Sequence, residues 1–468
     1  MSAGRLGRRV WRLALAAAVL GCGGLAGCAA ERERPPALLL VTVDTLRTDH
    51  LGAYGSDRGL TPHLDALAER SVVFDRAYAA APFTVPSVSA LLTGRFPEET
   101  GIHSNEVRLP DDLPTLASAL QAAGWRTAAV VSNFVLRRSS GLDRGFQVFD
   151  DRMTQRELIR KWPERDAPTT TEAAVELLRQ IALGDTPFFL WVHYQDPHGP
   201  YTPPDALRAA QLGRERARPG GREELALGRD HRGLGALPTY QAIDDEREVA
   251  FYRAGYAGEV AFMDAGVGRL LDELDALGLR DSTTVVFTAD HGEGLGDHDY
   301  WFAHGEYLTD ELTRVPLWVA HPGLEPGRRA DLVSQVDLFA SLASLLGIEV
   351  DGRAPYVRDL WAPGAESGAS TAYMASLTGS IRPRVGLVRG DHKVVGTRRE
   401  GRTEYTLFAL GAEDRDLGGD DPALLETMVQ ELESLRGSLL QRRSQGQELS
   451  ESDREALRAL GYLDDGDE

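Results

Sequence analysis

The stretch ALLLVTVD, residues 37–44, runs from apolar residues straight into an aspartate. A run this apolar is typical of a strand that is buried on both faces of a parallel sheet. Three similar runs follow along the chain: TAAVVS (127–132), PFFLWVHY (187–194) and TTVVFTAD (283–290). Amphipathic helical patterns alternate with these runs at 61–70, 113–123, 169–182 and 257–278. The alternation predicts an α/β fold with a large, mostly parallel sheet.

Polar side chains stand where these predicted strands end. Asp44 and Asp290 each close an apolar run, and PFFLWVHY reaches its polar end at His193. In α/β folds with an open parallel sheet, ligands bind beyond the carboxyl ends of the strands. We therefore expect the functional site at this edge of the sheet.

The segment AAPFTVPSVSALLTGRFP (80–97) predicts a short helix beside that edge. Pro86 and Ser87 suit the first turn of a helix, and Gly94 suits its end. Thr84 would then stand at or near the N-cap, beside backbone N–H groups that form a ready anion site. Taken alone, the segment favours a simple capping role for Thr84.

Histidines gather in two short polar segments. TADHGEGLGDHDYWFAHGE (288–306) holds His291, His298 and His304, and WVHYQDPHGPY (191–201) holds His193 and His198. These are five of the eleven histidines in the chain. Such a density beside acids favours a metal or anion site over structural histidines. For Arg47 and Asp49 of VDTLRTDHLG (43–52), a local ion pair is the preferred interpretation.

The charge and the cysteine content of the chain exclude several classes of function. The 468-residue chain has 71 acids against 51 bases, a formal charge of −20. We expect no nucleic-acid partner, because phosphate-backbone binders carry a basic face. An anionic substrate stays open, since a metal ion can outweigh a diffuse negative field. Cys22 and Cys28 are the only cysteines, which leaves no thiol nucleophile or zinc cluster downstream.

The first 27 residues predict a targeting segment. A basic start precedes the apolar LALAAAVL (13–20), which is too short to span a bilayer. Leu25 to Cys28 read LAGC, which resembles a bacterial lipobox and makes Cys28 the expected lipidation site. A plain cleaved signal and a twin-arginine signal at Arg8-Arg9 are the alternatives. We expect a lipid anchor in the membrane of the cell envelope, on its periplasmic or extracellular face, in the outer membrane if the cell is Gram-negative.

The predicted organisation has four parts. A signal peptide (1–27) and a tether (28–36) precede a catalytic domain (37–350), and a C-terminal subdomain follows (351–468). Residues 202–248, rich in Pro, Gly and Arg, are interpreted as an insertion or lid, with a mobile surface loop as an equal alternative. Ser450 to Asp453 resemble a capping box and predict a terminal helix near 451–461.

In order along the chain, these motifs resemble the sulfatase family of the alkaline phosphatase superfamily. VDTLRTDHLGAYG resembles the first metal-binding motif, TVPSVSALLTG the nucleophile motif and TADHGE the second metal-binding motif. The resemblance runs from about residue 37 to 345. It implies an alkaline-phosphatase-like α/β/α sandwich with a smaller C-terminal α+β subdomain.

Three departures from the family pattern bear on the chemistry. Thr84 stands where the family has the Cys or Ser that becomes formylglycine, Val88 replaces the supporting Arg, and Thr45 replaces a second acid. The sequence therefore predicts no formylglycine. Threonine is the nucleophile of related phosphoethanolamine transferases and nucleotide pyrophosphatases. The leading prediction is a metal-dependent hydrolase of phosphate or phosphonate esters, with sulfate esters possible as secondary substrates. The alternatives are a phosphotransferase that moves a phospho-headgroup onto an envelope lipid or glycan, and a non-catalytic binding protein.

The resemblance also implies roles for individual residues. Asp44, Thr84, Asp290 and His291 would hold one divalent metal ion, Mn²⁺ or Zn²⁺ first and Ca²⁺ as a further option. Asn105 and Asn133 would donate hydrogen bonds to phosphoryl oxygens. His198 and His304 would stabilise charge or protonate the leaving group, and His193, grouped with the substrate-binding residues, would orient the metal shell rather than touch the substrate. The expected substrate is a small-molecule, glycan or lipid ester.

Overall fold

The computed structural model describes residues 35–156, 163–350, 352–365, 370–377, 381–441 and 447–459. The predicted signal peptide and Cys28 lie outside these residues. Within the described part of the chain, no helix is both long and apolar enough to cross a membrane.

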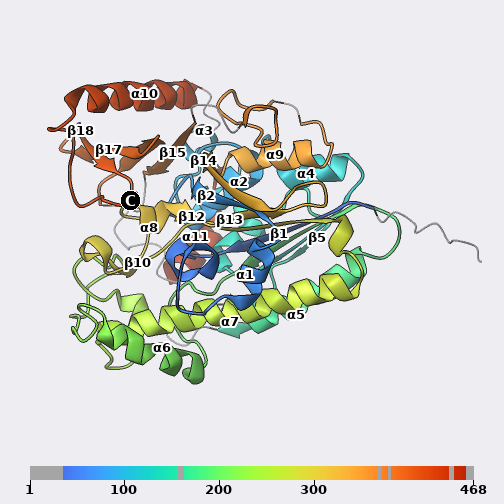
Figure 1. The fold of residues 1–468 in the computed structure, drawn as a ribbon, viewed down its shortest axis with the longest axis horizontal. Helices are drawn as coiled ribbons and strands as arrows, with labels where there is room; N and C mark the ends of the chain where they lie inside the picture. The colour runs from blue at the N-terminus through green and yellow to red at the C-terminus, as the bar shows by residue number, and fades with distance from the viewer. Residues whose placement is uncertain are drawn as a thin grey trace, which may run out of the picture. The chain divides into compact units, whose positions relative to one another are not determined.

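A large mixed sheet forms the centre of the molecule (Figure 1). Its strand order is β12-β2-β13-β9-β1-β8-β4-β5, with β14 paired to β2. The pairs of β1 with β8 and β9, and of β4 with β5 and β8, are parallel, whereas β13 runs antiparallel to both β9 and β2. The strand bounds are β1 Ala37–Val43, β2 Val72–Tyr78, β4 Arg126–Val131, β5 Val148–Asp150, β8 Phe188–Tyr194, β9 Thr283–Ala289, β12 Arg314–Val315, β13 Leu317–Ala320 and β14 Gly327–Ser334.

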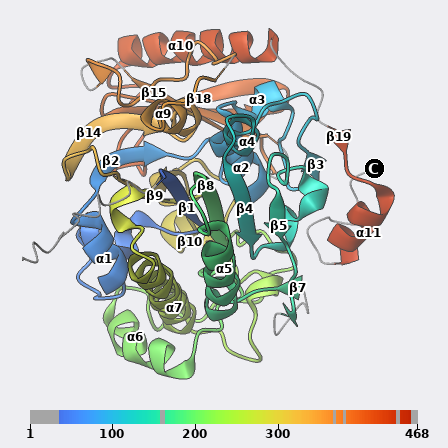
Figure 2. The same cartoon turned by 90° about the vertical axis from the view of Figure 1, so that its right-hand side faces the viewer.

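Helices cover both faces of this sheet (Figures 1 and 2). On one face lie α1 (Pro62–Ala68), α5 (Ala167–Ile181) and α7 (Val249–Ala276). On the other lie α2 (Thr84–Thr93), α4 (Leu116–Ala122) and α9 (Asp337–Leu345). A side-chain cap begins α5: the Asp166 carboxylate accepts from the backbone N–H of Thr169 at 3.0 Å. The predicted α/β/α sandwich is confirmed.

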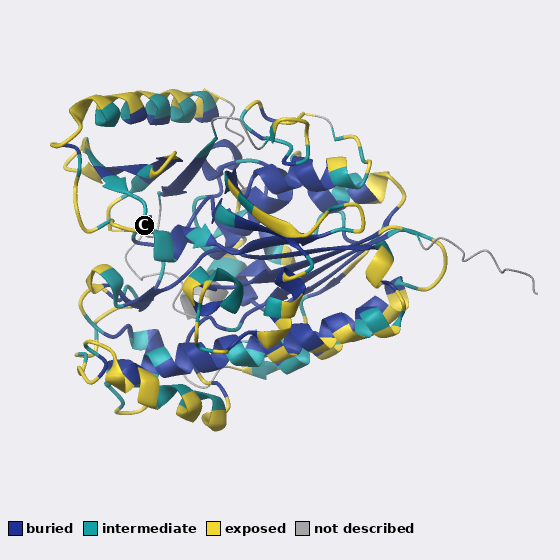
Figure 3. Cartoon of the chain, in the orientation of Figure 1, coloured by how far each residue is buried: buried dark blue, intermediate teal, exposed yellow. Residues whose placement is uncertain are grey.

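The core explains why the four apolar runs are strands. Every residue of β1, β8 and β9 is buried, because helices pack against both faces of the sheet (Figure 3). The observed strands and helices fall within one to three residues of the predicted ranges, except that α7 begins eight residues earlier than the pattern at 257–278 suggested. Residues 249–256, VAFYRAGY, are apolar at most positions rather than on one face, so they give little amphipathic signal.

The C-terminal part forms a second, smaller layer. Four antiparallel strands, β15 (Thr371–Ser376), β16 (Arg384–Arg389), β17 (His392–Arg399) and β18 (Arg402–Ala409), pair in sequence order. Helix α10 (Pro422–Gln441) covers them, and Met428 and Leu432 of α10 are fully buried against this sheet. This is the α+β subdomain that the resemblance implies.

The remaining α-helices and β-strands of the described chain are mostly short. They are α3 (Pro97–Thr100), β3 (Val107–Arg108), β6 (Gln155–Arg156), β7 (Pro163–Glu164), α6 (Asp205–Ala217), β10 (Gly294–Leu295), β11 (Trp301–Ala303), α8 (Asp310–Thr313), β19 (Gln447–Glu448) and α11 (Glu451–Ala459). The capped terminal helix is confirmed, since the hydroxyl of Ser450 accepts from the N–H of Asp453 at 3.2 Å.

The region 202–248 contains α6 and a series of turns. Helix α6 packs on α7, and a Cβ at Gly258 of α7 would lie 2.8 Å from Pro203. Glycine is therefore needed for this close approach. Further on, Tyr240 donates from its hydroxyl to the carbonyl of Phe302 at 2.8 Å, which brings the region to strand β11, directly before His304.

Candidate active site

Neighbouring strands bring the two predicted carboxylates together. Val43 of β1 pairs with Ala289 of β9, so the next residues, Asp44 and Asp290, leave the sheet side by side. On the other side of β1, Thr42 pairs with His193 of β8. The His193 Nε2 atom lies 3.6 Å from Asp44 Oδ2. The strand-end prediction thus holds for all three residues.

His291 turns an unprotonated nitrogen toward the two acids. Its Nδ1 lies 2.9 Å from the carbonyl of Gly292, and a carbonyl only accepts, so the proton is assigned to Nδ1. Nε2 then lies 3.5 Å from Asp290 Oδ2 and 3.9 Å from Asp44 Oδ1. Burial, followed by the nearby His304, lowers the pKa of His291 to about 3, which keeps the ring neutral.

These residues fit a divalent metal ion. Asp44 Oδ1, Asp290 Oδ2, His193 Nε2 and His291 Nε2 are buried without a hydrogen-bond partner among the described residues. Asp44, His193 and Asp290 each offer a ligand atom, and these atoms lie within 4.8 Å of one another. Burial, with Asp44 as the second cause, raises the pKa of Asp290 well above its usual value. A cation held between Asp44, His193 and Asp290 would satisfy their buried atoms and offset this charge repulsion.

Asn133 supports a carboxylate in this arrangement. Its side-chain amide donates to Asp44 Oδ2, and its Oδ1 accepts from the N–H of Val135 at 3.0 Å. Both ends of the amide are therefore engaged by the protein. The structure places Asn133 as an orienting partner of Asp44, where the sequence assigned it to a phosphoryl oxygen.

Helix α2 begins at Thr84, with Phe83 rather than Thr84 as its N-cap. Thr84 is 1% exposed. One turn on, the Ser87 hydroxyl lies 2.6 Å from the backbone carbonyl of Asp290, which fixes the start of the helix against the end of β9. Asn105 accepts from the N–H of Val85 at 3.0 Å through Oδ1. Asn105 therefore caps the first turn of helix α2 through this oxygen.

A hydrogen-bonded chain holds His304 in place. His304 Nδ1 lies 3.1 Å from Glu293 Oε1, and Tyr201 donates from its hydroxyl to Glu293 Oε2 at 3.0 Å. The His304 ring centroid lies 4.6 Å from that of His291 and 5.3 Å from that of His198. Sequence reasoning missed Glu293 and Tyr201, although Glu293 is the acid that closes TADHGE.

Backbone strain marks the first motif. Thr45, which stands in place of the family's second acid, has a φ of 55°. This left-handed conformation is unfavourable for a β-branched residue. It turns the N–H of Thr45 toward Asp290 Oδ1, which accepts at 3.1 Å. Strain of this kind persists where the surrounding structure enforces it, and it clusters at functional sites.

Three other polar residues of the motifs, Arg47, Asp49 and His298, make contacts outside the group around Asp44 and Asp290. Arg47 and Asp49 form the expected ion pair, with Nη2 2.7 Å from Oδ2, and Arg47 also pairs with Asp297 at 2.5 Å. His298 lies 3.5 Å from Glu311 and 3.1 Å from Asp414. It is thus held by another acidic cluster, while the four other histidines of the two segments gather near Asp44 and Asp290.

A mostly parallel sheet with carboxylates and imidazoles at its strand ends, beside a helix that begins with a buried threonine, is an arrangement suited to a metal-dependent hydrolase. The chain belongs to the sulfatase family: the family profile described as Sulfatase matches residues 36–348. Members of this family are metal-dependent hydrolases of sulfuric esters.

Individual relatives and solved structures are similar to this chain. The chain is 28% identical to an ulvan-active sulfatase of Formosa agariphila, over 72% of this chain and 66% of that protein. It is 29% identical to human iduronate 2-sulfatase, over 68% and 70%. Among solved structures, phosphonate monoester hydrolase of Agrobacterium radiobacter superposes with a TM-score of 0.68 at 20% identity, covering 86% of this chain and 96% of that one.

Another solved structure, a complex with its substrate D-glucosamine-2-N,6-O-disulfate, superposes with a TM-score of 0.69 at 19% identity, covering 87% and 98% of the two chains. These two likenesses establish the fold.

Proposed function

We propose that this protein hydrolyses phosphate or phosphonate monoesters or diesters, with Thr84 as a covalent nucleophile. The observation that carries the proposal is the buried threonine at the start of α2, whose first turn is tied to Asp290 through Ser87. A threonine cannot yield the aldehyde of formylglycine, so the chemistry has to use its hydroxyl.

The four buried atoms of Asp44, Asp290, His193 and His291 would hold the metal ion, with Thr84 beside them. Two carboxylates and two imidazoles are a ligand set that suits Zn²⁺ or Mn²⁺ better than Ca²⁺. A bound divalent ion would lower the pKa of the Thr84 hydroxyl and neutralise charge on the ester.

The remaining roles belong to the chain's own side chains. The Thr84 hydroxyl loses its proton to water, and its oxygen forms a bond to phosphorus while the bond from phosphorus to the leaving oxygen breaks, which gives a phosphothreonine. His304 donates the proton that the leaving alkoxide needs, with His198 as the neighbouring imidazole. Glu293 and Tyr201 orient His304, and Asn133 orients Asp44. Water then cleaves the phosphothreonine.

Sulfate ester hydrolysis by the same threonine is the second candidate, because the curated relatives of this chain include sulfatases. A panel of aryl phosphate monoesters, diesters, phosphonates and sulfates, measured in Mn²⁺, Zn²⁺ and Ca²⁺, decides between the two. We expect the phosphoryl esters to have the higher kcat/KM. A strong preference for sulfate would replace the leading proposal with the second.

The test of the nucleophile uses two substitutions. Thr84→Ala should abolish turnover without unfolding the protein, whereas Thr84→Ser should keep measurable activity because the hydroxyl remains. Denaturing the enzyme during turnover of a slow phosphoryl substrate should leave a phosphoryl mass on the Thr84 peptide. Wild-type turnover in Thr84→Ala would rule out covalent catalysis at this residue.

We further propose that Cys28 carries a lipid that anchors the enzyme to the outer face of a membrane in the cell envelope. The support is the LAGC sequence after a basic and apolar start. Cys28→Ala should move the enzyme from the membrane fraction to the soluble fraction. An unchanged distribution would exclude this anchor.

A further inference from the structure

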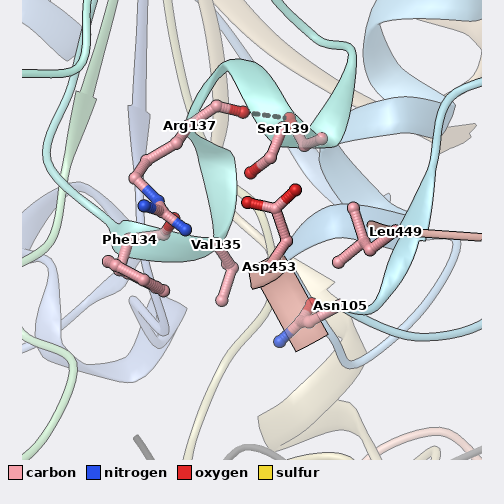
Figure 4. Close-up of a pocket in the computed structure, with 8 residues that line it drawn as sticks. Asn105, Phe134, Val135, Arg137, Ser139, Leu449 and Asp453 are labelled. Carbon is pink, nitrogen blue, oxygen red and sulfur yellow. Dashed lines mark hydrogen bonds between the residues drawn. The ribbon is translucent and has the colours of Figure 1, made fainter. Parts of the chain in front are cut away.

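Segments that are far apart in the chain also meet outside the candidate active site. At the hollow drawn in Figure 4, Asn105 and Val135 meet Leu449 and Asp453 of the terminal segment, and the space between them has room for about one water molecule. The cluster around His298 differs from this hollow, because it joins an imidazole to several carboxylates.

Three segments of the chain contribute to this cluster. His298 lies in the turn between β10 and β11, Glu311 lies in α8, and Glu413 follows β18. One ring nitrogen or carboxylate oxygen of each residue lies within 4.8 Å of those of the other two. Figure 1 shows α8 between β10 and β17. The C-terminal subdomain and the segment that leads to His304 therefore meet at these side chains.

The spacing within the cluster fits two ligands of one metal ion. His298 Nε2 lies 3.5 Å from Glu311 Oε1. An N–H···O hydrogen bond is shorter, at about 2.7–3.2 Å. Two atoms that bind one tetrahedral Zn²⁺ ion at about 2.1 Å lie roughly 3.4 Å apart. In the candidate active site, His291 Nε2 lies at the same distance, 3.5 Å, from Asp290 Oδ2.

Asp414 stands at the other nitrogen of the imidazole. Its Oδ1 lies 3.1 Å from His298 Nδ1. A proton on Nδ1 faces this acid, and the lone pair of Nε2 then faces Glu311. Metal-bound histidines commonly present their second nitrogen to a carboxylate in this way. A cation between Nε2 and Glu311 Oε1 would remove the repulsion between their lone pairs.

The protein holds both carboxylates in place. Glu311 Oε1 accepts from the Thr309 hydroxyl at 2.6 Å. Glu413 Oε2 accepts from the N–H of Asp310 at 2.7 Å, and Glu413 Oε1 lies 2.5 Å from Lys393 Nζ. An ionised carboxylate has about four lone-pair sites, so each of the two can still bind an ion.

The charge of the cluster favours a cation. Four carboxylates and one ammonium group meet there, and they belong to Asp310, Glu311, Glu413, Asp414 and Lys393. The side chains of His298, Glu311 and Glu413 are 24%, 12% and 4% exposed. Water therefore reaches the histidine side of the cluster, and the excess negative charge on the other side is poorly screened.

We propose that His298, Glu311 and Glu413 bind one Zn²⁺ ion, at a site separate from the one at Asp44 and Asp290. One imidazole and two carboxylates suit Zn²⁺, and a water molecule completes the tetrahedron. The inference does not depend on the proposed ester hydrolysis.

The role of this ion is structural. It ties α8 and the segment before His304 to the C-terminal subdomain. Because the ammonium group of Lys393 lies beside Glu413, the site binds Zn²⁺ more weakly than the site at Asp44 and fills second in a titration.

Equilibrium dialysis of chelator-stripped protein against a series of free Zn²⁺ concentrations tests the proposal. The wild type should take up one equivalent more than His298→Asn, and Glu311→Gln should show the same deficit. Asparagine is chosen because it tolerates the positive φ of 55° at position 298. Asp414→Asn should keep the equivalent and bind it about tenfold more weakly, since it changes the partner of Nδ1.

The same comparison in a second background separates the two sites. Asp290→Asn should lose the equivalent at the candidate active site and keep this one, and the double variant Asp290→Asn/His298→Asn should lose both. The difference made by His298→Asn decides the result in either background, whether or not any ester is hydrolysed.

Two matched variants serve as controls. His392→Asn removes a half-buried imidazole of the subdomain, and Asp299→Asn removes the acid next to His298, whose φ of 56° is also positive. Neither should change the number of bound ions. Equal uptake by the wild type, His298→Asn and Glu311→Gln would overturn the proposal, and so would an equal deficit in the two controls.

Discussion

Asp44 and Asp290 put two carboxylates into a fully buried position, an arrangement that costs stability and favours binding of a cation. Burial alone would raise the pKa of Asp44, but the surrounding imidazoles, His198 first, hold that pKa below its usual value. Burying these two acids lowers the stability of the metal-free protein, and a bound ion would offset that loss.

We predict opposite effects of Asp290→Asn with and without metal. In chelator, the variant should be as stable as the wild type or more so, because one of two buried like charges is gone and Asn Oδ1 can still accept from Thr45 and His291. In saturating Zn²⁺ or Mn²⁺, the wild type should gain about 2.7 kcal/mol at a hundredfold excess over Kd, and the variant much less. Thermal unfolding in both buffers measures this, and an equal metal-induced gain in the two proteins would contradict the ligand assignment.

A second prediction concerns His304 and Glu293, the acid that contacts it. If His304 protonates the leaving alcohol, His304→Gln should slow phenyl esters by about 10²- to 10⁴-fold and 4-nitrophenyl esters far less, since a nitrophenolate leaves without a proton. Glu293→Gln should show the same dependence on the leaving group to a smaller extent. Uniform losses across leaving groups would assign His304 to charge stabilisation instead.

Residues at the strand ends could be predicted from the sequence because their signal is local: an apolar run stops at a polar residue. Asp44, His193, Asp290 and His291 were found in this way. Glu293 and Tyr201 could not be predicted as a pair from the sequence, because their hydrogen bond joins positions 92 residues apart and neither residue belongs to a periodic pattern.

Among the elements of the fold, the region 202–248 shows how little of the structure amino-acid composition alone can predict. Its Pro, Gly and Arg content predicted an insertion, yet helix α6 within it has few buried residues and so gives little periodic signal. A buried ion pair attaches this helix: Arg58 binds Glu215, and their side chains are 7% and 0% exposed. Such an anchor depends on two distant residues and cannot be read from either segment.

We predict that Glu215→Ala lowers the free energy of unfolding by about 3–5 kcal/mol, because it leaves the guanidinium of Arg58 buried and unpaired. The matched control is Asp57→Ala, which removes the adjacent pair between Asp57 and Arg214, with side chains 84% and 42% exposed. That loss should stay below about 1 kcal/mol. Urea unfolding of both variants measures the difference, and similar small losses would show that the pair is dispensable.

For the whole molecule, the sequence predicted a catalytic sheet followed by a smaller subdomain, because the pattern of the strands changes near residue 350. It did not predict how the two parts join or where the chain goes afterwards. The pairing of β19 with β3 involves two residues of each strand, too few for any periodic signal. The contact between α3 and β15 is similar: it depends on Glu98 and Tyr373, 275 residues apart.

This contact should make stability depend on pH. Tyr373 donates from its hydroxyl to Glu98, and burial raises the pKa of Glu98 from 4.5 to about 7, although the Tyr373 hydrogen bond opposes the rise. Between these two values the folded protein keeps a proton that the unfolded chain releases, so stability falls as pH rises from about 4.5 to 7. The fall is roughly 3 kcal/mol, since each pKa unit corresponds to about 1.4 kcal/mol.

Glu98→Gln should remove this part of the pH dependence, because Gln cannot ionise and can still accept from Tyr373. The variant should therefore match the wild type near pH 5 and exceed it at pH 8. Tyr373→Phe serves as a contrast: it removes the hydrogen bond and leaves the buried acid, so it should destabilise at both values and more at pH 8. Unfolding free energies across this range test the contact, and parallel profiles for wild type and Glu98→Gln would show that Glu98 is already charged at the bottom of the range.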